Sequence, residues 1–366
     1  MDWATLRKKK KKIPILPAIF LLFLTGLILS AFLKWDWIVT QYNKIPGMYH
    51  IAKGDKKLKE EKFFEAIEHY KTGLLLFPNH SQAWCNLGNI YVTYENYTEA
   101  AEKYREGLKH TNKDFVCRIN LGIILSEKLL EHDEAIIQYQ KVIDSPVPAF
   151  TIPYFTRDKK TALANQGLAY YNMGMTYKHK ALLDSENSSL FAENLYNAAD
   201  KLEKASEILK TDYDVFYNLA LTHQQLNNNS EAKQAYCKAI ELEPLKYEAH
   251  YNLAVLLKKE KDYKAALDEF EKVSLILEYY KNPAISRYVF ELLNEVRGKI
   301  ILIPHGSLYL AERFESKFIE ENQITYKKGK LKIPDEFDEK MINNFKICSI
   351  NDIIDKNKTT KNDKQK

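Results

Sequence analysis

Residues 213–244 read YDVFYNLALTHQQLNNNSEAKQAYCKAIELEP, and residues 247–278 read YEAHYNLAVLLKKEKDYKAALDEFEKVSLILE. The two stretches align without a gap at a period of 34 residues, which is typical of a repeated pair of antiparallel helices. Small residues recur where two helices must cross closely, and large residues recur beside them. The small residues are Ala220, Ala232, Ala254 and Ala266, and the large ones are Leu219, Tyr236, Leu253 and Phe270.

The same pattern continues toward the N-terminus. Further units begin at Gly47, Ser81, Phe115 and Gly167, so that about six units span residues 47–280. The third unit fits only if one residue is inserted in its turn, and the fourth has roughly a dozen extra residues between its helices. A single match would be weak evidence, but six in phase predict a stack of helix pairs, interrupted or kinked where Pro146, Pro148 and Pro153 fall.

These positions resemble the tetratricopeptide repeat family. In that family the first helix carries large–Leu–Gly/Ala–Tyr and the second carries Ala–aromatic–small–Pro. The second unit fits at every expected place, with Trp84, Leu87, Gly88, Tyr91, Ala100, Tyr104 and Gly107. The resemblance implies an all-α fold: an α-solenoid of about six helix pairs, closed by a capping pair because terminal repeats must cover the open core.

The predicted organisation follows from this spacing and from the breaks in it. Units 1–3 are expected over residues 47–148, a proline-containing linker over 149–166 and units 4–6 over 167–280. Residues 182–191 (LLDSENSSLF) are rich in turn formers and are predicted to separate the two helices of unit 4. Capping helices are expected over 281–325. A basic, polar and partly disordered tail follows over 326–366. Within it an amphipathic piece, residues 337–354, either packs on the folded part or stays free of it.

The N-terminal segment predicts a membrane anchor. Residues 13–33 (IPILPAIFLLFLTGLILSAFL) carry no charge, and about 20 apolar residues in a helix span a bilayer core. The basic segment 1–12 precedes them, and residues 34–46 are expected to form a tether. A cleaved signal peptide is the alternative. It would have a shorter apolar region followed by a small-x-small cleavage site, and Phe32, Leu33 and Lys34 do not fit that pattern.

Charge predicts the orientation of this single-pass membrane protein. Residues 1–12 carry Arg7 and five consecutive lysines against Asp2, so their net charge equals the +5 of the whole chain. The positive-inside rule places them in the cytoplasm and the repeats outside it, in the periplasm if the membrane is a bacterial inner membrane. Gly26 and Ser30 form a small-xxx-small pair through which two copies could associate as a homo-oligomer.

The sequence carries no sign of catalysis or of a cofactor. It contains no phosphate-binding glycine loop, no HExxH and no GxSxG motif. Cys85, Cys117, Cys237 and Cys348 are scattered singly, so neither a zinc site nor a redox motif is indicated. They are predicted to be free thiols, with one disulfide as the alternative if the domain lies outside the cytoplasm. Nucleic acid binding is not expected, because the folded part is nearly neutral.

The candidate site is the concave groove that the family lines with its first helices. At the fifth and sixth places of these helices the chain repeatedly presents tyrosine and asparagine. Asparagine can hydrogen-bond an extended peptide, and tyrosine is favoured at interfaces. The predicted protein-binding residues are Asn86, Asn89, Asn120, Tyr171, Asn172, Tyr217, Asn218, Tyr251 and Asn252, with Lys258 and Lys259 adding positive charge at one end.

The predicted function is a membrane-anchored scaffold that is not an enzyme and that binds protein partners. It resembles anchored repeat proteins of cytochrome maturation, pilus assembly, envelope quality control or the flagellar motor periphery. One alternative is an organelle import receptor whose repeats lie in the cytosol, against the charge rule. Another is a non-catalytic accessory part of a membrane glycosyltransferase.

Overall fold

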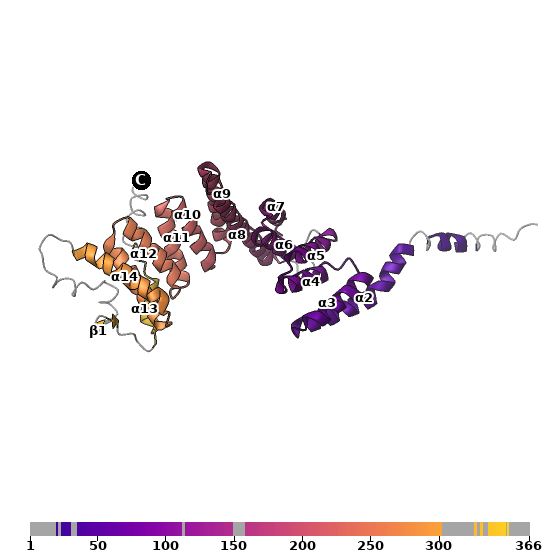
Figure 1. Cartoon of the computed structure of the whole chain (residues 1–366). Coiled ribbons are helices and arrows are strands. Elements are labelled where there is room, and N and C mark those ends of the chain that lie inside the picture. The colour runs from indigo at the N-terminus through magenta and orange to yellow at the C-terminus, as the bar shows by residue number, and fades with distance from the viewer. Residues whose placement is uncertain are drawn as a thin grey trace, which may run out of the picture. The chain divides into compact units, whose positions relative to one another are not determined.

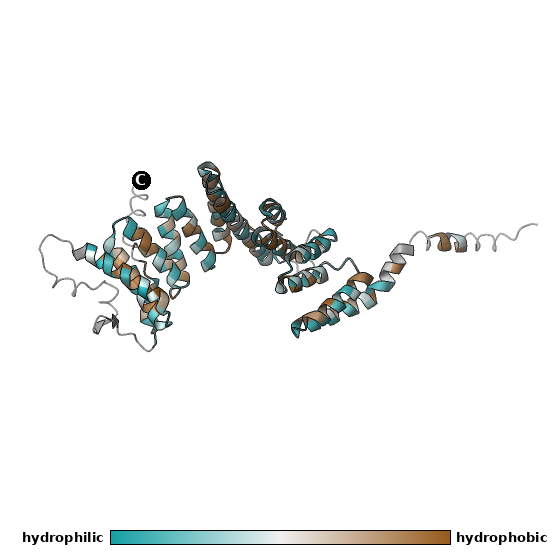
Figure 2. Cartoon of the chain, in the orientation of Figure 1, coloured by the Kyte–Doolittle hydropathy of each residue, from teal (hydrophilic) through white to brown (hydrophobic). Residues whose placement is uncertain are grey.

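The computed structural model describes residues 20, 23–30, 35–111, 114–148, 158–301, 326–327, 330–331, 336–348 and 350 (Figure 1). They form two compact units, residues 1–121 and residues 122–366, whose boundary falls inside one helix. Figure 2 shows apolar and polar residues alternating along most of the helices, as expected for helices that bury one face.

The first compact unit consists of successive antiparallel helix pairs. Helix α2 (Trp35–Lys59) packs on α3 (Phe63–Leu76), and α4 (Ser81–Thr93) packs on α5 (Tyr97–Lys109). Helix α6 (Phe115–Glu127) begins the third pair. Residues 35–46, predicted to be a tether, are instead the first half of α2, which continues through Pro46 into the first repeat.

The second compact unit continues the same architecture. Its pairs are α8 (Lys159–Leu183) with α9 (Ser188–Ile208), α10 (Tyr213–Gln225) with α11 (Asn229–Leu242), and α12 (Tyr247–Lys259) with α13 (Tyr263–Tyr279). Helix α7 (His132–Ile143) packs on α8, and α14 (Pro283–Ile301) packs on α13 as the first predicted capping helix. Its expected partner, over residues 306–321, lies outside the described residues.

The small residues of the repeat lie at the helix crossings. Ala220, Ala232, Ala254 and Ala266 are all fully buried. In the second and third repeats glycine takes the place of Ala220 and Ala254. A Cβ on Gly88 would lie 2.6 Å from Cε1 of Tyr104, which is closer than any real contact allows. The close crossings inferred from the spacing are therefore confirmed.

The turn between the two helices of a repeat recurs with the same backbone geometry at the 34-residue period. Glu61, Glu95, Asn227 and Lys261 all have φ near +60°. Around Lys261, for example, Asp262 N–H bonds to the Leu257 carbonyl and Lys261 N–H bonds to the Lys258 carbonyl, which is a Schellman motif. In the third repeat the equivalent residue is Leu130, 35 positions after Glu95 rather than 34. The single inserted residue predicted for this turn is thus confirmed.

Leu130 offers a test of this turn. A non-glycine residue in the left-handed region costs about 1–2 kcal/mol, whereas glycine loses about 0.5–1 kcal/mol of chain entropy on folding. Leu130 has φ 58° and is 62% exposed, so Leu130→Gly is expected to stabilise the protein by about 0.5–1 kcal/mol in urea denaturation. The matched control is Lys141→Gly at an exposed position of helix α7, which should destabilise by about 1 kcal/mol. A destabilising Leu130→Gly would contradict this account of the turn.

The fourth repeat differs from the prediction. The turn formers at 182–191 were expected to make a loop, yet only residues 184–187 separate α8 from α9. Asn187 Oδ1 accepts from the backbone N–H groups of Ser189 and Leu190, both at 3.2 Å, and so starts α9 early. Most of the extra residues therefore lengthen the two helices, to 25 and 21 residues.

The linker prediction is also partly wrong. Residues 149–157 lie outside the described residues, but α8 begins at Lys159, so residues 159–166 are helical. Asp158 caps this helix, its Oδ2 accepting from Thr161 N–H at 3.0 Å. Pro146, Pro148 and Pro153 all precede that cap, and nothing after it interrupts the helix.

A segment near the C-terminus docks on the last repeats. Residues 336–348, here called the C-terminal strap, contain helix α16 (Glu339–Lys346). Phe345 is fully buried and, with Met341, packs on Leu275 and Ile276 of α13. Of the two possibilities left open for this amphipathic piece, the structure thus has the docked one. A two-residue strand pair, β1 (Tyr326–Lys327) and β2 (Lys330–Leu331), precedes it.

The four cysteines form two disulfides, so the prediction of free thiols is wrong. Cys85 pairs with Cys117, and Cys237 of α11 pairs with Cys348 of the C-terminal strap, each with Cα atoms 5.5 Å apart. The fold brings together cysteines that are far apart in sequence, which spacing along the chain could not reveal.

Most of the predicted anchor is not described. Phe20 and residues 23–30 are helical, and the rest of residues 13–33, with segment 1–12, lie outside the described residues. Among the helices that are described, none combines the length and the apolar character needed to cross a bilayer.

Candidate protein-binding face

Tyrosines occupy equivalent places on three first helices of the second compact unit. Tyr171 lies on α8, Tyr217 on α10 and Tyr251 on α12, and all three rings pack half-buried on the core. The Tyr251 ring lies 6.5 Å from the ring of Tyr288 on α14, which extends the row by one helix. Together with the asparagines that follow them, these tyrosines form what we call the first-helix face: Tyr171, Asn172, Tyr217, Asn218, Tyr251 and Asn252.

The asparagines of this face hydrogen-bond to tyrosines of the preceding repeat. Asn218 Nδ2 donates to Tyr171 Oη at 3.2 Å, and Asn252 Nδ2 donates to Tyr217 Oη at 2.9 Å. Asn172 instead donates to the backbone carbonyl of Leu168 at 2.8 Å. The amide donors of Asn218 and Asn252, which were expected to meet a peptide, therefore already join neighbouring repeats.

Burial keeps the tyrosines of this face neutral. It raises the pKa of Tyr171 to about 12, and it raises the pKa of Tyr251 to about 12 with help from the neighbouring Tyr288 hydroxyl. Burial also raises the pKa of Tyr217. Because a raised tyrosine pKa favours the protonated form, each hydroxyl keeps its proton at physiological pH and can both donate and accept.

The predicted positive end of the face is largely neutralised. Lys258 Nζ lies 2.6 Å from a carboxylate oxygen of Glu295 on α14. Lys259 is exposed and contacts Asn227 Oδ1 at 3.5 Å. Of the two lysines predicted there, only Lys259 retains a charge that no carboxylate offsets among the described residues.

A different lysine, which the sequence analysis missed, lies on this face. Lys178 of α8 is partly buried, and its Nζ donates to Asn218 Oδ1 at 3.0 Å. Desolvation lowers the pKa of Lys178 to about 8. Its place could have been found from the sequence, because it is the twelfth residue of its repeat, a place that the family directs toward its groove.

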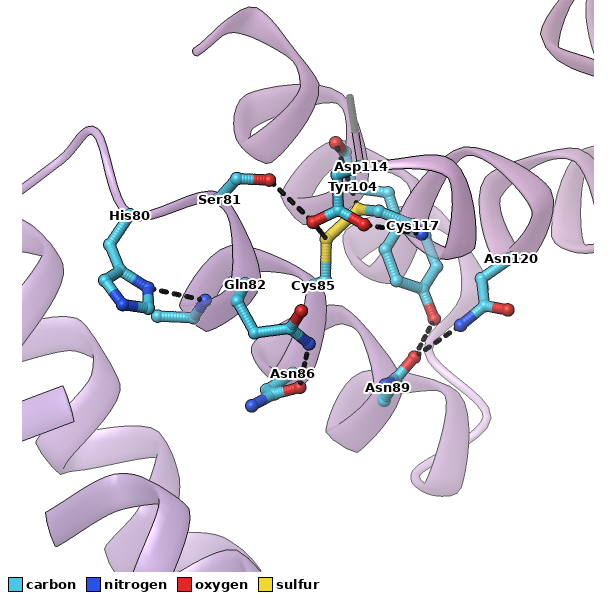
Figure 3. Close-up of a disulfide and its surroundings, with 11 residues drawn as sticks. His80, Ser81, Gln82, Cys85, Asn86, Asn89, Tyr104, Asp114, Cys117 and Asn120 are labelled. Atoms are coloured by element: carbon cyan, nitrogen blue, oxygen red, sulfur yellow. Dashed lines mark hydrogen bonds between the residues drawn. A yellow bond between two sulfur atoms is a disulfide. The ribbon is translucent and has the colours of Figure 1, made fainter. Parts of the chain in front are cut away.

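In the first compact unit the predicted asparagines also bridge helices (Figure 3). Asn89 Oδ1 accepts from Tyr104 Oη at 2.6 Å and from Asn120 Nδ2 at 3.1 Å. Asn86 Nδ2 donates to Tyr70 Oη at 3.2 Å and to Asp55 Oδ1 at 3.1 Å. As in the second compact unit, hydrogen bonds fix the orientation of each amide.

The Cys85–Cys117 disulfide joins first helices of adjacent repeats, α4 and α6 (Figure 3). Asp114 lies beside it: Oδ2 accepts from Ser81 Oγ at 2.8 Å, and Oδ1 accepts from the Cys117 backbone N–H at 3.1 Å. The ligating atoms of Cys85, Asp114 and Cys117 lie within 4.8 Å of one another, close enough to hold a metal ion. With the sulfurs bonded to each other, however, only Asp114 keeps a charge for a cation.

Comparison with known proteins agrees with this architecture. The family model described as "Tetratricopeptide repeat" matches residues 51–114 and 217–275. The human protein O-mannosyl-transferase TMTC3 is 24% identical over 255 residues, which are 63% of this chain. The chain spans only about a quarter of the length of that relative.

One of the similar solved structures supports the same fold. The structure of Pseudomonas aeruginosa PilF has a TM-score of 0.50 at 16% identity and covers 68% of this chain and 98% of its own. PilW, described as a widely conserved type IV pilus biogenesis factor, has a TM-score of 0.46 at 16% identity, with coverages of 62% and 91%. The matched residues, the buried small residues at their crossings and the 34-residue period together identify residues 51–114 and 217–275 as tetratricopeptide repeats.

Proposed function

We propose that the protein is a membrane-anchored scaffold that holds a protein partner on its first-helix face, outside the cytoplasm. The observation that carries this proposal is the tyrosine–asparagine ladder across α8, α10 and α12. It fixes the side chains before any partner arrives, so little side-chain entropy remains to be lost on binding. Half-buried tyrosines whose hydroxyl groups can form further hydrogen bonds suit a peptide that is held by both apolar and polar contacts.

The two disulfides support a location outside the cytoplasm. Disulfides persist in oxidising compartments and are rare where cellular thiols are kept reduced. All four cysteines are paired, and both pairs tie separate elements together. This agrees with the orientation that the lysine run at residues 8–12 favours.

Anchoring gives the scaffold its mechanism. An apolar helix over residues 13–33 would confine the repeats to the membrane surface, which raises the effective concentration of a membrane-bound partner. The scaffold would then promote assembly without catalysing a reaction, as in the assembly of a pilus, a flagellar motor or a cytochrome maturation complex.

Site-specific photo-crosslinking in intact cells tests the proposal. A photoreactive phenylalanine analogue replaces Tyr288, which adjoins Tyr251 and is 53% exposed. The matched control replaces Tyr196 of α9, which is 60% exposed on a second helix. A discrete protein adduct from Tyr288 and none from Tyr196 is expected. Equal adducts from both positions, or an adduct from Tyr196 alone, would rule out the first-helix face.

A second candidate is a non-catalytic repeat portion of a membrane glycosyltransferase. The match to TMTC3 over 255 residues favours it, because that relative is named as an O-mannosyl-transferase. If this is correct, the adduct from Tyr288 should be a glycosyltransferase subunit or its acceptor protein. An adduct with an unrelated envelope protein would favour the assembly scaffold.

A further inference from the structure

Two histidines face each other across the first helix pair. His50 of α2 and His69 of α3 are both partly buried, and their Nδ1 atoms lie 3.4 Å apart. The ring centroids are 5.7 Å apart and the ring planes are tilted by 41°, so the two nitrogens lie between the rings. Among the described residues, neither ring hydrogen-bonds to any other group.

The distance between the two nitrogens matches a shared metal ion better than a direct hydrogen bond. Hydrogen bonds from N–H groups in proteins are about 2.7–3.2 Å between heavy atoms, and the two Nδ1 atoms are farther apart than that. Two nitrogens that each lie about 2.0–2.1 Å from one tetrahedral zinc ion stand roughly 3.3–3.4 Å apart. His50 and His69 therefore already have the spacing of two ligands of one ion.

The chemistry of the donors selects the kind of ion. Imidazole nitrogen suits zinc, copper and nickel, whereas magnesium and calcium prefer oxygen. Lys53 places a positive charge near the pair, with its Nζ 4.6 Å from the centre of the Tyr49 ring, while Lys57 is offset by Glu65 at 2.6 Å. Because this charge opposes any cation held by attraction alone, the ion must be one that bonds strongly to nitrogen.

The surroundings also favour the form of His69 that binds a metal. Burial lowers the pKa of His69, and the positive groups nearby, His50 first and then Lys53, lower it further. A lowered histidine pKa favours the neutral ring, and the neutral ring is the metal ligand.

We propose that His50 and His69 bind one divalent transition-metal ion of the zinc class through their Nδ1 atoms, and that the ion joins α2 to α3. Two positions of a tetrahedral ion then remain for water. An ion that binds only when both helices are in place stabilises the folded pair by mass action. The site goes beyond the proposed function, because it lies in the first compact unit and uses no residue of the first-helix face.

Calorimetric titration of the full-length protein, purified without a histidine tag in detergent micelles, tests the site with the chlorides of zinc, nickel and magnesium. Zinc and nickel should bind and magnesium should not. His50→Gln and His69→Gln should each weaken zinc binding by at least about tenfold, since losing even a residue that supports a ligand costs about 10–100-fold. The matched control, His110→Gln, removes an exposed imidazole at the end of α5 in the same compact unit and should leave the affinity unchanged.

A second measurement uses the wild-type protein and so does not depend on how the variants fold. Diethyl pyrocarbonate modifies neutral imidazole nitrogens, and mass spectrometry reports the extent of modification at each histidine. Zinc should protect His50 and His69 together and leave His110 reactive. Zinc affinity that is unchanged in either His50→Gln or His69→Gln, or protection of His110 equal to that of the pair, would overturn the assignment.

Discussion

Replacing Cys237 and Cys348 with alanine together is expected to cost about 4 kcal/mol of unfolding free energy. The disulfide closes a loop between residues 111 positions apart, and closing so long a loop restricts the unfolded chain strongly. It also fixes the C-terminal strap, whose Phe345 and Met341 fill an apolar site on α13. Without it, the strap must be held by that packing and by the hydrogen bond from Lys272 to the Ile347 carbonyl.

Urea denaturation of the second compact unit, with hydrogen exchange at α16, measures this effect. Amides of α16 should exchange much faster in the double variant. Removing Cys85 and Cys117 is the matched control, since their separation of 32 residues predicts a loss smaller by about 1 kcal/mol within the first compact unit. Unchanged protection of α16 would show that the non-covalent contacts, rather than the disulfide, hold the strap.

Lys272→Met is expected to destabilise the second compact unit by about 3–5 kcal/mol, because it leaves a buried carboxylate without its cation. Glu269 is fully buried and receives Lys272 Nζ at 2.9 Å and His250 Nδ1 at 2.5 Å. Lys272 Nζ also donates at 2.7 Å to the backbone carbonyl of Ile347 in the C-terminal strap. The variant therefore loses the ion pairs with Glu269 and Asp268 together with the strap contact.

The double variant Lys272→Met with Glu269→Gln separates these effects. Removing the buried charge together with its partner should recover most of the loss, since a neutral buried pair costs far less than a lone carboxylate. Equal instability of the single and double variants in urea would show that the strap contact, and not the charge, dominates.

The pH dependence of this network has a definite sign. Desolvation alone would lower the pKa of Lys272, but the charges of Glu269 and Asp268 outweigh it and raise the pKa above its ordinary value of 10.5. A raised lysine pKa gives stability that is fully present below the unfolded pKa and is lost as pH rises through the folded one. The contribution should thus be constant through neutral pH and decline only in strongly alkaline solution.

The repeats could be predicted from the sequence because their physics is local and periodic. A close helix crossing needs a small residue, so Ala232 and Ala266 mark it wherever they recur at 34 positions. Even the inserted residue before Leu130 could be predicted, since it shifts the second-helix matches of that unit, Ala135, Tyr139 and Val142, by one.

Where the structure departs from prediction, it is determined by contacts that do not recur from one repeat to the next. The early start of α9 depends on one cap, Asn187, in a stretch whose composition predicts a loop. The docking of the C-terminal strap depends on Phe345 reaching α13 from about 70 residues away in the chain. Asn218 and Asn252 were predicted to lie in a row of groove side chains. Their hydrogen bonds to the tyrosines of the same row were not predicted.

The two disulfides connect cysteines that are consecutive in the chain, the first with the second and the third with the fourth. Four cysteines allow three connectivities, and this is the one that a chain oxidised in order of synthesis reaches without reshuffling. At about 5–20 residues per second, Cys348 is made some 6–22 s after Cys237. By then Cys85 and Cys117 can already be bonded to each other, so Cys237 is the one thiol left for Cys348 to pair with. Maturation of this protein should accordingly need an oxidant but little help from a disulfide isomerase.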